Sequence, residues 1–263
     1  MTQSVASTII CVELCLAAHG AVAADITPIA VSPEAQQVKT ESGWTFTFAP
    51  YFWGAGLSGD LGTRGREVHV DASFSDIWDH LDFAAMAIGE ARYGRFSIVG
   101  DVLYTKLSGN QATPRGFFAK SIDVDAETFA GFAGLGYSVL EDSAGRLDIV
   151  GGVRVWSANT EISARGGILD GRSISDGNTW VDALGGIKGS YFLTPDFFVT
   201  GWGLVGGGGA DIDWDVAATV GYKFNETFSA VAGYRALGVD YSNDGFVFDV
   251  VEQGPILRLA VKF

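Results

Sequence analysis

Apolar and polar residues alternate at every second position over much of this chain, and this pattern constrains the fold more than any other feature. Successive side chains of a β-strand point to opposite faces, so the pattern predicts strands with one apolar and one polar face. The stretch from residue 212 to 223 separates the two faces best. Its apolar parity carries Ile212, Trp214, Val216, Ala218, Val220 and Tyr222, and its polar parity carries Asp213, Asp215, Thr219 and Lys223.

Other segments repeat this division, with large apolar residues on one parity and charges of mixed sign on the other. A soluble β-sandwich would carry dense charge on its water-facing side, whereas these charges are widely spaced, as in a lumen crossed by ion pairs. The pattern therefore predicts an all-β fold, a transmembrane antiparallel up-and-down β-barrel. The residues expected to face outward are Trp44, Phe46, Phe48, Phe52, Ile98, Val102, Ile149 and Val153.

Turn signals set the number of strands, because bacterial barrels alternate short turns at one end with longer loops at the other. Short turns are predicted at Tyr93-Gly94-Arg95, Glu141 to Arg146, Thr194-Pro195-Asp196 and Asn225-Glu226. Longer loops are predicted at Gly59 to Asp82, Ser108 to Gly116, Ala164 to Gly177, Gly206 to Ala210 and Ser242 to Gly245. Four turns and five loops predict about ten strands, with eight or twelve as alternatives.

The organisation of the chain is predicted from its 263 residues as one domain behind a removable leader. Residues 1–24 resemble a signal peptide, with an apolar stretch before Ala21-Val22-Ala23, although Glu13 and the lack of an early Lys or Arg leave the start codon open. Residues 25–42 are predicted to be a short periplasmic leader and residues 43–263 the barrel. Both cysteines, Cys11 and Cys15, fall in the signal, which excludes disulfide and thiol chemistry from the mature chain.

Composition excludes two further classes of protein. The formal net charge of −14 and the lack of a basic patch argue against a nucleic-acid partner. No run of eighteen apolar residues follows the signal, so a membrane-spanning helix is not expected.

The charged residues on the inward parity form the main candidate site. Buried charges must be paired, so we expect ion pairs that lock the lumen; the alternative is a narrow water path lined by Asp101, Asp148, Arg154 and Arg235. The predicted lumen-lining charges are Glu90, Arg92, Asp101, Asp148, Arg154, Asp182, Lys188, Lys223, Arg235, Glu252 and Arg258.

Two motifs resemble sites of other chemistry. Residues 201–206 match the spacing of a dinucleotide-binding glycine loop but lack the helix that such a loop requires. The run from Asp211 to Asp215 begins like a calcium loop, yet Val216 and Tyr222 stand at its Gly and Glu positions, so we interpret it as a rim of carboxylates that attracts cations. No cofactor is expected.

The first long loop holds both histidines of the mature chain, His69 and His80. Residues 76–82 combine His80 with three aspartates, but their spacing specifies no metal site, and a solvated amphipathic turn is the simpler interpretation. No metal ion and no catalytic residue are therefore predicted. An enzyme at this rim, a hydrolase or a lipid-modifying enzyme, remains the alternative function because these imidazoles are the available bases.

The C-terminal strand carries a family resemblance. Leu257, Leu259, Val261 and the terminal Phe263 resemble the C-terminal signature that the barrel-assembly machinery recognises in outer-membrane barrels. The segments 48–53, 70–77 and 94–96, with Asp101 and Tyr104, also resemble a group of uncharacterised proteobacterial outer-membrane barrel proteins over most of the mature chain. The resemblance implies fold and location and brings no catalytic residue.

Together these patterns predict an integral protein of the Gram-negative cell outer membrane. We expect a structural barrel or a narrow porin-like channel for small solutes or ions, without enzymatic activity. Its predicted partners are outer-membrane lipid, the barrel-assembly machinery and, for a channel, small solutes or ions.

Overall fold

The computed structural model describes residues 43–63, 66–112, 121–168 and 170–263. The predicted signal peptide and leader lie outside the described residues and stay predictions. Within the described part, no helix is both long and apolar enough to cross a bilayer.

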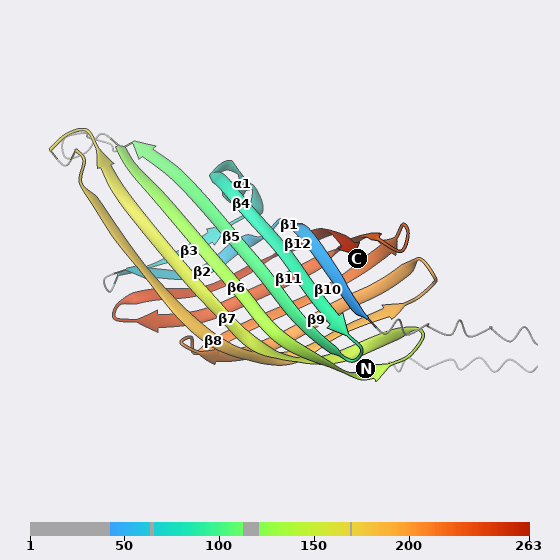
Figure 1. Ribbon diagram of the computed structural model, residues 1–263. Coiled ribbons are helices and arrows are strands. Elements are labelled where there is room, and N and C mark those ends of the chain that lie inside the picture. The colour runs from blue at the N-terminus through green and yellow to red at the C-terminus, as the bar shows by residue number, and fades with distance from the viewer. Residues whose placement is uncertain (1–42, 64–65, 113–120, 169) are drawn as a thin grey trace, which may run out of the picture. The chain divides into compact units, whose positions relative to one another are not determined.

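Ten strands form a closed antiparallel barrel (Figure 1). Each strand pairs with the next along the chain apart from β1, which pairs with β4, and β1 also pairs with β12 to close the sheet. The predicted fold class and the predicted number of strands are confirmed. The barrel strands are β1 Trp44–Trp53, β4 Leu81–Tyr93, β5 Phe96–Ala112, β6 Ser121–Glu141, β7 Gly145–Arg165, β8 Ser173–Phe192, β9 Phe197–Gly208, β10 Ile212–Lys223, β11 Phe228–Asn243 and β12 Phe246–Lys262.

Two further strands and a helix occupy the segment between β1 and β4. The hairpin of β2 (Gly56–Thr63) and β3 (Arg66–Ala72) pairs with the first half of β12, beyond the point where β1 ends, and α1 (Phe74–Asp79) follows it. The prediction of a loop from Gly59 to Asp82 is therefore wrong for most of its length. Pairing with β2 gives partners to the backbone groups of β12 that β1 does not reach.

Short connections join the strands at the turn end of the barrel, where the four turns were predicted. The turn between β4 and β5 places Gly94 at φ 54°, a left-handed conformation that glycine adopts without strain. At the opposite end, β11 and β12 are joined by Asp244 and Gly245, with φ values of 48° and 82°. Positive φ at both positions is the geometry of a tight two-residue hairpin.

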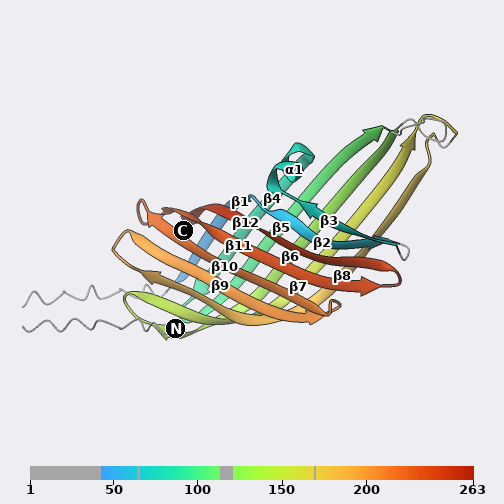
Figure 2. The ribbon, with the colours of Figure 1, turned by 180° about the vertical axis from the view of Figure 1, so that it is seen from behind.

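Strands β5 to β8 are much longer than a membrane requires. They contain 17, 21, 21 and 20 residues, whereas about 9–11 tilted residues span a bilayer. The ladder between β8 and β9 stops at Asp182, so the preceding part of β8 continues without a β9 partner. Figures 1 and 2 show these strands reaching beyond the rest of the barrel on the loop side.

The outer face of the barrel is apolar, as the alternation predicted. Phe48, Ile149 and Val220 are about half exposed. Trp44 packs against Tyr93 at the turn end, with ring centroids 5.4 Å apart, and Phe52 packs against α1 on the loop side. An apolar belt with aromatic residues at both edges matches the hydrocarbon layer and its two interfaces.

Candidate functional site

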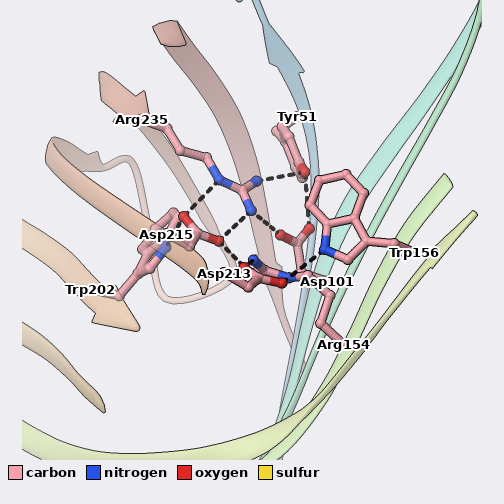
Figure 3. Close-up of polar contacts among 8 residues, drawn as sticks. All are labelled: Tyr51, Asp101, Arg154, Trp156, Trp202, Asp213, Asp215 and Arg235. Carbon is pink, nitrogen blue, oxygen red and sulfur yellow. Dashed lines mark hydrogen bonds and ion pairs between the residues drawn. The ribbon is translucent and has the colours of Figure 1, made fainter. Parts of the chain in front are cut away.

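Arg235 on β11 is the centre of a buried polar network inside the barrel (Figure 3). Its guanidinium donates to the Tyr51 hydroxyl at 2.8 Å and to carboxylate oxygens of Asp101 at 2.6 Å and Asp215 at 2.7 Å. The Tyr51 hydroxyl donates in turn to Asp101 at 2.9 Å. One side chain therefore links β1, β5, β10 and β11.

Arg154 on β7 continues this network from another part of the wall. It donates to Asp213 at 2.5 Å and to Asp215 at 2.7 Å. The indole N–H of Trp156 donates to Asp213 and that of Trp202 donates to Asp215, each at 2.8 Å. The central network comprises Tyr51, Asp101, Arg154, Trp156, Trp202, Asp213, Asp215 and Arg235.

Four charged side chains of the central network are almost inaccessible to solvent. Arg154 and Arg235 have relative exposures of 2% and 1%, and those of Asp213 and Asp215 are 0% and 1%. The Arg235 guanidinium also lies 5.1 Å from the ring centre of Trp53. Since an unpaired buried charge is costly, each member depends on its partners, and the network holds the strands in one register.

An aromatic and aliphatic cluster fills the interior next to this network. Its rings include Trp180 and Tyr241, stacked with centroids 3.9 Å apart, and Trp156, which belongs to both the cluster and the network. It extends to Phe246 and Phe248 at the start of β12, so it lies toward the loop side. Tight packing of large rings leaves little room for water.

A second network occupies the turn side of the interior. Glu90 accepts from Arg92 at 2.9 Å, lies 3.5 Å from Arg146 and pairs with Lys188. Arg92 also pairs with Asp148. Three cations, Arg92, Arg146 and Lys188, share the two carboxylates of Glu90 and Asp148. This turn-side network therefore carries more positive than negative charge.

A cavity of about 340 Å³ lies on the turn side, bounded by this second network and by residues next to the turns. We call it the turn-side vestibule. A smaller cavity of about 40 Å³ lies beside the central network. Both are lined by Ile88, Lys188 and Arg258.

The remaining lumen charges have diverse environments. Asp182 accepts from the backbone N–H of Ala210 at 2.8 Å, and Lys223 pairs with Glu226 in the next turn at 2.6 Å. Among the described residues, Glu252 and Arg258 form no ion pair.

The predicted rim of carboxylates is wrong for two of its three members. Asp213 and Asp215 lie in the interior and are neutralised by Arg154 and Arg235, while Asp211 alone remains exposed. The alternation placed the side chains on the inner face but contained no information on how far the strand extends below the rim. The glycine motif at residues 201–206 forms part of β9.

The two histidines of the first long segment have structural partners. His69 bonds the Asp60 carboxylate at 2.8 Å, and His80 bonds the backbone carbonyl of Asp76 at 2.8 Å. Neither imidazole contacts a serine or threonine hydroxyl in the part of the chain that the structure describes, and no three His, Cys, Asp or Glu side chains there are grouped to hold a metal ion. Of the expected amphipathic turn at residues 76–82, only Asp76 to Asp79 belong to the helix α1, whereas Leu81 and Asp82 begin β4.

Asp76 is the N3 residue of a capping box at the start of α1, in which Ser73 is the N-cap. The Ser73 hydroxyl accepts from the Asp76 N–H, and the Asp76 carboxylate accepts from the Ser73 N–H at 3.0 Å. Hydrogen bonds from Ser73 to the carboxylate lower the pKa of Asp76. The ionised form is thus favoured in the folded helix, and this contribution is lost as pH falls through the lowered pKa.

We predict that Ser73→Ala raises the pKa of Asp76 toward its ordinary value, because the hydroxyl donor is removed. A pH titration of the Asp76 carboxyl carbon by NMR measures this shift. Ser108→Ala is the control, since the Ser108 hydroxyl donates to Asp82 and the bonds that lower the pKa of Asp76 come from Ser73. An unchanged pKa in Ser73→Ala would contradict the capping assignment.

Sequence reasoning missed the uncharged members of the central network. Tyr51 shares the inward parity of Thr45, Thr47 and Ala49, and Trp156 shares that of Arg154, and this parity was the available signal. Their role was not evident because indole and phenol groups are also ordinary core residues.

Comparison with known proteins gives no family. No family model matches the chain, and no curated protein matches it. Among solved structures, the translocator domain of the autotransporter NalP from Neisseria meningitidis is similar with a TM-score of 0.44 and 14% identity, covering 89% of this chain and 92% of that chain. The attachment invasion locus protein Ail of Yersinia pestis is similar with a TM-score of 0.37 and 12% identity, covering 84% and 99%.

The outer surface determines where this barrel resides. A closed sheet satisfies its own backbone hydrogen bonds, and the apolar belt with aromatic edges is suited to a bilayer. The chain is an integral β-barrel protein of the Gram-negative outer membrane.

Proposed function

We propose that this chain is a structural, non-enzymatic barrel whose lumen is closed to the free diffusion of solutes. The central network carries the proposal. Arg154 on β7 and Arg235 on β11 bond side chains from β1, β5 and β10, so the ion pairs cross the interior. A water path lined by Asp101, Arg154 and Arg235 would require these ion pairs to separate.

Two further observations support a closed lumen. The loop-side cluster fills the interior with stacked rings next to the network, and the cavity beside Arg154 is only about 40 Å³. A ten-stranded barrel is only slightly wider than the eight-stranded barrels that side chains fill completely. The long strands β5 to β8 then form a sheet that extends from the barrel beyond the membrane.

The test is single-channel conductance of the refolded protein in planar bilayers. We expect no stepwise current from the folded wild-type protein, because the ion pairs and rings block the lumen. Stepwise currents that change in Asp101→Ala and Arg154→Ala would contradict the closed structural barrel and support a narrow channel instead. A large-pore porin run in the same bilayers confirms that insertion is detected.

The partners of His69 and His80 favour the non-enzymatic proposal over an enzyme at the rim. A general base for a nucleophilic hydroxyl must lie within hydrogen-bond reach of it, and among the described residues no serine or threonine hydroxyl bonds either imidazole, each of which bonds its partner through Nδ1. Hydrolysis of ester or phospholipid substrates by the wild-type protein, abolished in His69→Ala or His80→Ala, would contradict the proposal.

A further inference from the structure

Arg258 on β12 is a partly buried cation that forms no ion pair with the described residues. Its Nε atom is buried and has no hydrogen-bond partner among them. The aromatic ring of Trp202, centred 5.4 Å away, covers one side of it. A partly desolvated cation without a bonded carboxylate is costly, so an anion from outside the chain would be stabilising.

The surroundings of Arg258 open toward the turn end. Arg258 lines the turn-side vestibule, whose volume of about 340 Å³ exceeds that of a small anion several-fold. Alternation along β12 places Arg258 and Lys262 on the inner face, while Leu257 and Leu259 face outward. The strand that presents apolar residues to lipid therefore also directs two cations into the cavity.

The charge lining the vestibule is positive, although the chain as a whole has a net charge of −14. Its lining includes six cationic side chains and three carboxylates. Glu90 pairs with three of these cations, and Lys223 pairs with Glu226. In the described part of the chain, Arg258 and Lys262 form no ion pair, so most of the excess positive charge lies on β12.

We propose that the turn-side vestibule binds a small soluble oxyanion, a phosphate or carboxylate compound that enters from the turn end. The Arg258 guanidinium is its main ligand, because its planar fork matches two oxygens of such an anion, and Lys262 adds a point charge nearer the mouth. The strands enclose the site, which favours a soluble anion over a lipid headgroup. Phe198 and Val231 also line the cavity and leave room for an apolar part of an organic anion.

The probe is inorganic phosphate, titrated by isothermal calorimetry into the folded protein in a non-ionic detergent at constant ionic strength. We expect saturable binding at one site, weakened about tenfold or more in Arg258→Gln, which removes a charge-assisted interaction. Arg165→Gln is the control, since Arg165 pairs with Asp123 at the far end of β7 and should leave the affinity unchanged. Lys262→Gln, at an exposed position, should weaken binding several-fold and provides a second variant if Arg258→Gln does not fold.

Stability in phosphate-free buffer gives an independent result. Because Arg258 is unpaired in the free protein, Arg258→Gln should be at least as stable as the wild type without phosphate and should lose the stabilisation that phosphate gives the wild type. The proposal is overturned if the wild type shows no saturable phosphate binding, or if Arg258→Gln binds phosphate as the wild type does. Neither result would affect the closed lumen, which the conductance measurement tests separately.

Discussion

Replacement of Arg235 by methionine lowers the free energy of unfolding by about 3–5 kcal/mol, the cost expected when one partner of a buried ion pair is removed. Asp101 and Asp215 then lose a guanidinium that contacts them at 2.6 Å and 2.7 Å, and Tyr51 loses its donor. Methionine preserves much of the apolar volume, so the effect arises mainly from the uncompensated carboxylates. Urea unfolding of the refolded protein, followed by tryptophan fluorescence, measures the change.

A control and a rescue separate this effect from general damage. Lys223→Met removes a lysine whose partner, Glu226, is exposed in a turn, and should cost less than about 1 kcal/mol. Adding Asp101→Asn to Arg235→Met removes one of the uncompensated charges and should restore part of the lost stability. Equal losses in Arg235→Met and Lys223→Met would show that the central network does not hold the barrel together.

Arginine at position 48 should impair assembly, whereas arginine at position 47 should be tolerated. Phe48 is half exposed on the outer face, midway along β1 between Trp44 and Phe52, which lie near the two edges of the apolar belt. A lipid-facing arginine near the bilayer midplane costs about 2–4 kcal/mol. Thr47 instead lines the turn-side vestibule, where a new guanidinium can remain hydrated.

Refolding into phospholipid vesicles measures the difference between Phe48→Arg and Thr47→Arg. The folded fraction, read from the mobility shift of unheated protein on a denaturing gel, should fall sharply for Phe48→Arg alone. Phe48→Leu is the size control and should refold almost as well as the wild type. Equal impairment by both arginines would contradict the inward and outward assignments of β1.

In the segment between β1 and β4, the sequence pattern did not predict the two strands β2 and β3. Val68 and Val70 alternate with Glu67 and His69, so the signal for β3 was present, but it was short and lay in a stretch assigned to a loop. What makes β2 and β3 a stable hairpin is the free edge of β12, which a sequence does not display. The predicted loops at Ser108 to Gly116 and Ala164 to Gly177 likewise overlap the loop-side ends of β5, β7 and β8. Polar residues beyond the membrane weaken the alternation that marks a strand there.

The alternation by itself determined the fold class and the face that the strand side chains take, because a period of two is a local property of the strand backbone. The turn signals added the estimate of about ten strands. Only the tertiary structure decided which charges meet. Arg235 and Asp101 are 134 residues apart, and their contact depends on the stagger between strands, which sets the height of each residue inside the closed barrel. That stagger neutralises Asp213 and Asp215 in the interior and leaves Arg258 unpaired beside the vestibule, since small differences in height decide whether two charges come within bonding distance.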